Sequence, residues 1–451
     1  MNAARATIVV DLAFGDCGKG SVVDFLTREH AEAGETPLIV RFNGGPQAGH
    51  NVIMPAPGGR HHTFAQFGSG TFNPGVRTLL SRFMMIEPYA LINEAAHLRG
   101  IGVGEALQRL IIDGSCVVIT PPQQAANRLR ELARGANAHG TCGIGVGEAM
   151  ADAIERPELV LRARELADRA RVATKLRAVR EVKVEQLREP MALLGDMPRA
   201  RQAIDTLTND VWIDVAIDNY AWLAEQISIV DARAAQQLIR DSHAVIFEGA
   251  QGVLLDENHG FHPHTTWSTA TCANADALLD EAGFAGERTR LGVLRSYFTR
   301  HGPGPFVTED AALSDRLSEP HNDAGGWQGG FRVGAFDAVA TRYALAVAGG
   351  VDGIALTHVD RLPLLPPHIC TAYATEDGRV IRDIPVRRPA DLAHQERLTY
   401  QLQRCRPVYT PIDVADEAHF IATLERELVV RVVLASHGPT AADKRRRICS
   451  S

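Results

Sequence analysis

The nine residues Ala13-Phe14-Gly15-Asp16-Cys17-Gly18-Lys19-Gly20-Ser21 lie between two apolar segments. The run from Thr7 to Leu12 is typical of a buried strand, and the apolar residues that begin at Val22 are typical of a helix. Glycines let backbone amides approach an anion, and Lys19 can reach terminal phosphate oxygens. The stretch therefore predicts a phosphate-binding loop between a strand and a helix. The alternative is a plain dinucleotide turn or an unused glycine-rich turn.

This loop differs from an ordinary P-loop at one position. Gly20 follows Lys19, where a Ser or Thr would normally bind Mg²⁺. Asp16 can replace the missing oxygen ligand. Because a carboxylate in a phosphate loop is repelled by the phosphates, we expect a cation or a proton between Asp16 and the nucleotide.

The composition is that of an ordinary globular enzyme. The chain has 451 residues, 45% of them hydrophobic and 22% charged, and its net charge is −7. This charge does not favour nucleic acid or a membrane as a partner, so we expect a small molecule. Seven cysteines without metal-ligand spacing favour reduced thiols. With neither a signal-peptide pattern nor an apolar stretch of membrane-spanning length, the sequence predicts a cytoplasmic protein.

Strand and helix patterns alternate along the chain, which predicts an α/β fold: a single large domain, residues 1–451, around a mostly parallel central sheet. A helical insertion is expected over 158–240, where Leu159, Ala163, Leu166 and Ala170 fall at helical spacing. Residues 309–332 are predicted to form a mobile, substrate-binding loop. Helices are expected at 87–109 and 122–134, a strand pair at 111–112 and 116–119, and further strands at 38–42, 244–247, 291–294, 351–357 and 429–435.

Three other loops carry residues suited to a site. Residues 43–51 surround His50 with small and turn-forming residues, which favours a functional histidine over a packed one. Residues 138–147 form a second glycine loop without a lysine, which is weak evidence by itself. Residues 248–252, Glu-Gly-Ala-Gln-Gly, follow a strand and direct amide groups beyond its carboxyl end.

Taken in order, these loops make the chain similar to the adenylosuccinate synthetase family along nearly its whole length. The resemblance implies a P-loop-like, GTPase-related fold with subdomains. It also implies a ligase that uses GTP and Mg²⁺ to phosphorylate O6 of IMP or a related 6-oxopurine nucleotide, after which an amine, L-aspartate in the family, displaces the phosphorylated oxygen from C6. The matching motifs are 15–20, 47–50, 140–143, 248–252 with 254–256, 299–306 and 436–439.

The resemblance further implies roles for individual residues. Asp16 corresponds to the base that removes the N1 proton and, with the Gly49 carbonyl, to a Mg²⁺ ligand. His50 corresponds to the catalytic acid, and Asp360 to the carboxylate that reads guanine. Arg156 corresponds to an arginine contributed across a homodimer interface. The implied catalytic set is Asp16, Lys19, His50 and Gln251; the GTP site is Gly15, Gly18, Lys19, Gly20, Asp360, Ser436, Gly438 and Pro439; and the substrate-nucleotide site is Gln47, Thr141, Cys142, Arg156, Gln251 and Thr266.

The expected amine-donor loop departs from the family pattern. Of its arginines only Arg332 is kept in the stretch 326–332, and Ile144 stands where another is expected. A dicarboxylate needs guanidinium groups to offset its desolvation, so the loss of three arginines should weaken L-aspartate binding by several kcal/mol, at about 1.5–3 kcal/mol per charged hydrogen bond. Trp327 and Phe331 would suit an apolar or aromatic amine, or they merely fill the loop.

Three hypotheses therefore stay open. The first is a ligase of this kind that uses an amine other than, or in addition to, L-aspartate. The second is an ordinary adenylosuccinate synthetase of purine biosynthesis, with its aspartate-binding arginines elsewhere in the 309–332 loop. The third is a paralogue that binds a purine nucleotide without ligation. Asp16 and His50 argue against the third, since a binding protein needs neither a base nor an acid.

Overall fold

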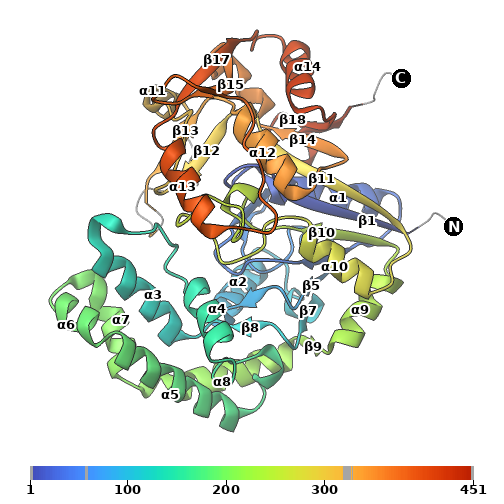
Figure 1. Cartoon of the computed structure of the whole chain (residues 1–451). Coiled ribbons are helices and arrows are strands. Elements are labelled where there is room, and N and C mark those ends of the chain that lie inside the picture. Colours follow the sequence, from blue (N-terminus) through green and yellow to red (C-terminus); the bar gives the residue numbers. More distant parts are fainter. Residues whose placement is uncertain (1–3, 56–58, 318–326, 328, 448–451) are drawn as a thin grey trace.

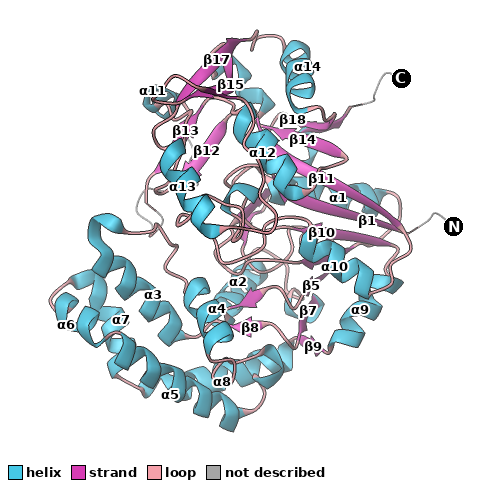
Figure 2. Cartoon of the chain, viewed as in Figure 1, coloured by secondary structure: helices cyan, strands magenta, loops and turns pink. Residues whose placement is uncertain are grey.

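The structure, a computed structural model, describes residues 4–55, 59–317, 327 and 329–447. A twisted sheet runs through the middle of the molecule (Figure 1). In the same view helices α3 to α8 form an arc below the sheet, and the elements from β12 onward lie mainly above it. Helices and strands alternate along the chain, as expected for an α/β protein (Figure 2).

The central sheet is mostly parallel, which confirms the prediction. Each pair of neighbouring strands is parallel except β18 and β19. β1 lies near its centre, with Val9 opposite Glu248 on one side and Leu291 on the other. In spatial order the strands are β19 (Lys444–Arg446), β18 (Val432–Ser436), β14 (Gly353–Thr357), β11 (Glu287–Arg295), β1 (Arg5–Asp11), β10 (Ala244–Glu248), β2 (Leu38–Arg41), β5 (Arg77–Leu80), β7 (Leu110–Asp113) and β9 (Ser228–Val230).

The main hydrophobic core lies against this sheet. Strands β2 and β10 are buried along their whole length, which explains why they read as continuous apolar runs rather than alternating ones. Side chains of α1, α12 and α14 pack into the same core, among them Val22, Ala344 and Phe420. The covering helices are α1 (Lys19–Glu32), α2 (Pro88–Gly100), α9 (Ala232–Asp241), α10 (Ala273–Glu281), α12 (Ala338–Ala348), α13 (Leu392–Leu402) and α14 (Glu417–Leu428).

The helical region differs in two ways from the predicted insertion over 158–240. The segment 159–168 forms no α-helix: the backbone N–H of Val118 donates to Leu161 and that of Ala163 donates to Cys116, which holds residues 160–162 extended before a short 3-10 turn, Ala163–Glu165. At the other end β9 pairs with β7 and belongs to the central sheet. The helices of the arc are α3 (Pro121–Arg134), α4 (Val146–Glu155), α5 (Arg169–Gln186), α6 (Arg188–Leu194), α7 (Pro198–Thr208) and α8 (Val211–Gln226).

Two further predictions need correction. The helix expected over 87–109 ends at Gly100, and only a short 3-10 turn, Leu107–Arg109, follows before β7. The expected strand pair does not exist, because β7 lies between β5 and β9 whereas β8 (Val117–Val118) pairs with β6 (Met85–Ile86). Apolar periodicity located these strands but carried no information about their partners.

Smaller sheets flank the central one. The hairpin of β3 (His50–Ile53) and β4 (His61–Phe64) carries His50. The pair β12 (Phe298–His301) and β13 (Phe331–Gly334) borders the predicted 309–332 loop, which begins with helix α11 (Ala311–Arg316); residues 318–326 and 328 of that loop lie outside the described residues. The third sheet contains β15 (His368–Ala374), β16 (Val380–Ile381) and β17 (Arg406–Pro411).

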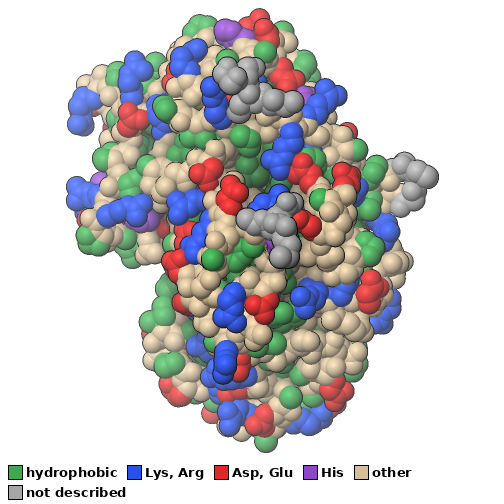
Figure 3. Space-filling view, turned by 90° about the vertical axis from the view of Figure 1, so that its right-hand side faces the viewer, with side chains coloured by type: hydrophobic (Ala, Val, Ile, Leu, Met, Phe, Trp, Pro, Cys, Tyr) green, Lys and Arg blue, Asp and Glu red, His purple; other side chains and the backbone are tan. Residues whose placement is uncertain are grey.

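Acidic and basic side chains are interspersed on the face shown in Figure 3. Among the described residues, no helix combines the length and the apolar character needed to cross a lipid bilayer.

Candidate functional site

A large cavity, with a volume of about 1170 Å³, opens where loops that follow the central strands converge. Loops after β1, β2, β10, β14 and β18 all contribute, because the carboxyl ends of parallel strands meet at one edge of a sheet. Most of the predicted site residues line this single cavity. They are Gly15, Asp16, Gly18, Lys19, Gly20, Gln47, Gly49, His50, Thr141, Cys142, Gln251, Thr266, Asp360, Ser436, Gly438 and Pro439.

Asp11, the last residue of β1, organises the predicted phosphate-binding loop. Its carboxylate accepts hydrogen bonds from the backbone N–H groups of Ala13 at 2.9 Å, Gly15 at 3.2 Å and Cys17 at 3.0 Å. The Nζ atom of Lys19 lies 3.0 Å from Oδ2 of Asp11, and both side chains are buried. The loop therefore keeps its shape, and Lys19 its position at the start of α1, through contacts within the chain.

The close approach of α1 and β3 explains why Gly20 stands where a P-loop has Ser or Thr. A Cβ atom at position 20 would lie 2.8 Å from Cβ of His50, which is closer than carbon atoms tolerate. Only glycine lets the hairpin that carries His50 pack against the start of α1. The missing hydroxyl and the presence of His50 on the cavity wall are therefore two consequences of one packing contact.

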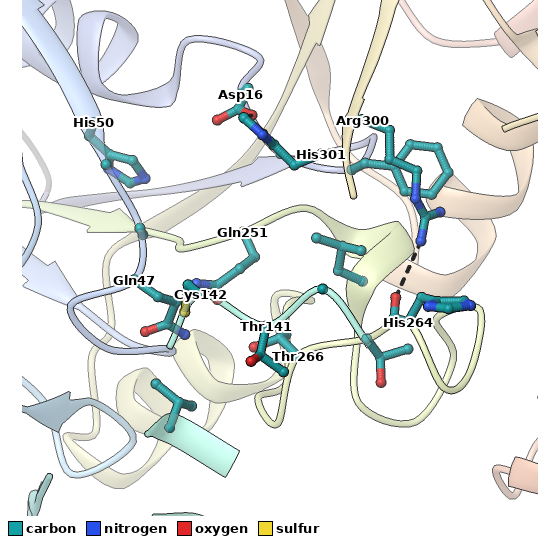
Figure 4. Close-up of a pocket in the computed structure, with 18 of the residues that line it drawn as sticks. Asp16, Gln47, His50, Thr141, Cys142, Gln251, His264, Thr266, Arg300 and His301 are labelled. Atoms are coloured by element: carbon teal, nitrogen blue, oxygen red, sulfur yellow. Dashed lines mark hydrogen bonds and ion pairs between the residues drawn. The ribbon is translucent and has the colours of Figure 1, made fainter. Parts of the chain in front are cut away.

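Asp16 projects into the cavity beside His301 (Figure 4). Its backbone has φ 60°, a left-handed conformation that Asp tolerates better than most residues. Nε2 of His301 lies 3.3 Å from Oδ2 of Asp16, and Nε of Arg295 donates to the Asp16 carbonyl oxygen at 2.6 Å. Burial raises the pKa of Asp16, but His301, Arg295 and Lys19 together outweigh burial and lower it below the ordinary value. Asp16 is thus an ionised acceptor at neutral pH.

His50 is held from behind by a buried carboxylate. Its Nδ1 atom lies 2.6 Å from Oε1 of Glu248, which also accepts hydrogen bonds from the backbone and hydroxyl of Ser69. Burial alone would raise the pKa of Glu248, but the charge of Arg41 and the hydrogen bond with His50 lower it to about 2. Burial lowers the pKa of His50 below its ordinary value in spite of Glu248. Nε2 of His50 is buried without a partner among the described residues, as expected of an atom that contacts a ligand.

Two glutamine side chains on the cavity wall also lack partners within the described part of the chain. Both amide atoms of Gln47 and both of Gln251 are buried, and none forms a hydrogen bond with a described residue. Gln251 has φ 54°, a strained backbone for a residue other than glycine. Leaving a buried polar group unpaired costs about 1–3 kcal/mol. These amides therefore indicate a polar ligand with both donors and acceptors on its edge.

The second glycine loop brings Thr141 and Cys142 to the wall, where Thr266 also lies (Figure 4). Glu131 of α3 accepts hydrogen bonds from the backbone N–H groups of residues 139–141 at 3.0–3.3 Å, which fixes the loop. Burial raises the pKa of Cys142 to about 11, so its thiol stays neutral at pH 7.

Four predicted site residues do not line the cavity: Arg156, Trp327, Phe331 and Arg332. Trp327 instead contacts the helical arc, where the guanidinium of Arg199 lies 4.7 Å from its ring centre. The ring of Phe331 lies behind His301, with ring centres 4.8 Å apart. Arg332 pairs with Glu309 at 2.8 Å and donates to two backbone carbonyls. Their assignment to an amine-donor site stays a prediction.

The structure adds residues that the sequence analysis did not assign. Asp11 positions Lys19, and Glu248 positions His50. The sequence feature that could have identified both is an acidic residue at the carboxyl end of a buried strand. Arg300 also lines the cavity; its guanidinium donates to the carbonyls of Pro303, Pro305 and His264 and lies over the ring of Phe14. No local pattern distinguishes such an arginine from a solvated one.

Comparisons with known proteins agree with this geometry. The sequence model of a family described as adenylosuccinate synthetase matches residues 8–444. The chain is 32% identical over 417 residues to an adenylosuccinate synthetase of Myxococcus xanthus, covering 91% of this chain and 87% of that protein. It is also 32% identical over 454 residues to one of Photobacterium profundum, covering 97% and 96%.

Two solved structures have a similar fold. A fully ligated adenylosuccinate synthetase from Plasmodium falciparum superposes with a TM-score of 0.75 at 19% identity, covering 99% of this chain and 100% of that one. A succinoaminodeoxyadenylate synthetase from cyanophage S-2L, bound to dGMP and to dATP as an energy donor, superposes with a TM-score of 0.59 at 19% identity, covering 99% and 96%. At this identity the likeness concerns the fold alone.

Proposed function

Since the chain belongs to the adenylosuccinate synthetase family and is thus a GTP-dependent ligase, we propose that it phosphorylates O6 of IMP or a related 6-oxopurine nucleotide, after which an amine bonds to C6 and phosphate leaves with O6. The observation that carries this proposal is the convergence on one cavity of an ionised carboxylate, Asp16, and a histidine, His50, whose Nε2 has no partner among the described residues. A phosphate loop with a buried lysine lines the same cavity.

The proposed reaction needs the groups that these residues offer. The carbonyl-like C6–O6 group becomes reactive toward an amine only when O6 carries a good leaving group. Asp16 would accept the N1 proton, which makes O6 nucleophilic, while Lys19 binds the terminal phosphate that O6 attacks. In its imidazolium form, which the negative phosphates of a bound GTP would favour, His50 would donate a proton from Nε2 toward the departing bridging oxygen while Nδ1–H donates to Glu248.

The residues present fit a magnesium ion. Asp16 carries an ionised carboxylate and Gly49 a backbone carbonyl, and both line the cavity with the phosphate loop. Mg²⁺ prefers such oxygen ligands and completes its shell with water and phosphate. When bound there, it would neutralise the charge of the phosphates that Lys19 would also contact.

The substrate nucleotide would occupy the half of the cavity lined by the two glutamines. Gln47 and Gln251 offer both donors and acceptors, which suits the edge of a 6-oxopurine. Thr141 and Thr266 would bind its 5′-phosphate. We also propose a homodimer in which Arg156, which lies outside this chain's own cavity, reaches a partner subunit, and a cytoplasmic location.

The amine donor is proposed to be L-aspartate or an amine with fewer charges. The second choice is supported by the contacts that two arginines, Arg332 and Arg300, already make within the chain. Arg332 pairs with Glu309, and Arg300 already donates to three backbone carbonyls. Nε of Arg332 has no partner among the described residues, but the terminal nitrogens of both guanidinium groups are engaged, so a two-pronged contact with a second carboxylate would displace contacts that the fold uses.

The deciding experiment measures phosphate release with GTP, Mg²⁺ and IMP against a panel of amines, with the product mass read directly. Asp16→Asn should lower turnover at least about 100-fold because it removes the base, while GDP binding persists. The exposed Asp413→Asn is a matched control that should leave turnover unchanged. Undiminished turnover of Asp16→Asn would reject the mechanism. If L-aspartate is the one amine of the panel that supports phosphate release, the protein is an ordinary adenylosuccinate synthetase.

A further inference from the structure

Asp360 and Arg361 lie next to each other on the cavity wall, in the 3-10 turn Val359–Leu364 that follows β14. Such a turn has three residues per turn, so residues three apart share a face. Val359 and Leu362 are both 3% exposed and face the core. Asp360 and Arg361 therefore both project away from the core, into the cavity.

The two side chains form a loose ion pair with spare hydrogen-bonding capacity. Nε of Arg361 lies 3.3 Å from Oδ2 of Asp360, and the side chains are 40% and 37% exposed. Within the described part of the chain, the Nη1 and Nη2 groups of Arg361 donate to no residue. The pair thus presents a carboxylate acceptor and a guanidinium donor side by side.

The neighbouring side chains are less suited to donate a hydrogen bond to a base. The hydroxyl of Ser436 donates to the carbonyl of Gly438 at 3.0 Å. The ring of His358 contacts Thr357 through Nδ1 at 2.9 Å and packs edge-on against Tyr297. Burial lowers the pKa of His358 well below its ordinary value, so this ring carries no charge at neutral pH.

An acceptor beside a cationic donor complements one edge of guanine. Guanine presents the acceptors O6 and N7, and N1–H and N2–H₂ donate on the adjoining side, whereas adenine carries a donor, N6–H₂, in place of O6. Arginine to O6 and N7 is a common guanine contact. We propose that Arg361 is a specificity-determining residue that donates to O6 of the bound GTP while Asp360 accepts from N1 and N2. This rests on the proposed function, in which Asp360 reads the base.

The competing explanation is that Arg361 only neutralises Asp360 and contacts no base. Two altered ligands separate the two explanations. Inosine diphosphate lacks the 2-amino group that would face Asp360. 2-Aminopurine riboside diphosphate lacks O6 and, with it, the N1–H, so only its 2-amino group can donate to Asp360. A contact between Arg361 and O6 affects binding of GDP but not of the 2-aminopurine ligand, whereas simple neutralisation affects both.

The experiment measures the dissociation constants of GDP, ADP and these two analogues by calorimetry, for the wild type and Arg361→Ala. We expect Arg361→Ala to weaken GDP roughly 10- to 100-fold, to leave the 2-aminopurine ligand nearly unchanged, and to preserve the ratio between GDP and inosine diphosphate. Arg379→Ala is a matched control, since Arg379 also pairs with a nearby acid, Asp377, at 2.7 Å through Nε but does not line the cavity. It should change no affinity.

Equal weakening of GDP and the 2-aminopurine ligand, or no weakening of either, would overturn the role of Arg361. Different results would contradict the proposed GTP site itself. The wild type would then bind ADP as tightly as GDP, or bind neither, and Asp360→Asn would not change the affinity for GDP. Thermal melting of Arg361→Ala shows whether the variant is folded, and Arg361→Lys, which keeps the charge but loses the fork, should recover only part of the GDP affinity.

Discussion

The substitution Glu248→Gln tests the arrangement that supports His50. Glu248 is fully buried, and its carboxylate accepts hydrogen bonds from His50 at 2.6 Å and from the backbone of Ser69 at 2.9 Å. Glutamine keeps the size of the side chain but removes the charge. Arg41, also fully buried, would then lack the negative charge that lies near it.

The size of the effect follows from the pKa of Glu248, which falls from 4.5 to about 2 in the folded protein. One pKa unit corresponds to about 1.4 kcal/mol, so the folded state favours the ionised form by about 3 kcal/mol. Because the folded pKa is the lower one, this stability is fully present above about pH 4.5 and is lost as the pH falls toward 2. We therefore expect Glu248→Gln to lower the free energy of unfolding by about 3 kcal/mol at pH 7.

Urea unfolding at pH 7, 5 and 3.5 measures this difference, and it should shrink at the lowest pH. Glu376→Gln, at a 69% exposed side chain, is a control that should change stability little. Turnover should also fall at pH 7, since the imidazolium of His50 loses its counter-charge. The reasoning is refuted if the variant is as stable as the wild type at pH 7, or if the difference is the same at pH 3.5.

Two further substitutions test the packing and a second buried acid. Gly20→Ala places a Cβ 2.8 Å from Cβ of His50, so it should cost about 1–3 kcal/mol in urea unfolding and reduce turnover by displacing His50; unchanged stability and turnover would contradict the packing argument. Burial raises the pKa of Asp337 from 3.8 to about 6, so wild-type stability is lost as the pH rises between these values. Asp337→Asn should therefore raise the free energy of unfolding by up to about 3 kcal/mol at pH 7 and leave it unchanged at pH 3.5. An equal increase at both pH values would contradict the raised pKa of Asp337.

Much of the fold and of the site could be predicted from short stretches of the chain. The glycine loop, the strand before it and the helix after it have local signatures, and they lie where expected, at β1 and α1. Apolar runs located β2, β10, β14 and β18 as strands of the parallel sheet. Parallel strands end at one edge, so the loops that follow them had to converge, and Asp16, His50 and Gln251 do line one cavity.

Other features depended on partners far away in the chain. Helical spacing over 159–168 was misleading, because Leu161 and Ala163 pair through their backbones with residues 116–118. Residues 228–230 lie within the segment predicted to be helical, yet they form β9, which pairs with β7 at the edge of the central sheet. Trp327 and Arg332 were grouped with an amine-donor site by their place in the sequence, yet they contact Arg199 and Glu309 rather than the cavity.

The division between local and tertiary information has a physical basis. Backbone preference, glycine conformation and apolar period act over a few residues, so the chain carried enough information to predict the phosphate loop and the class of chemistry. The protonation states and free hydrogen-bonding groups of the site arise from contacts across long separations: Glu248 behind His50, and His301 beside Asp16. Burial and electrostatic interaction depend on distance in space, which only the folded chain defines.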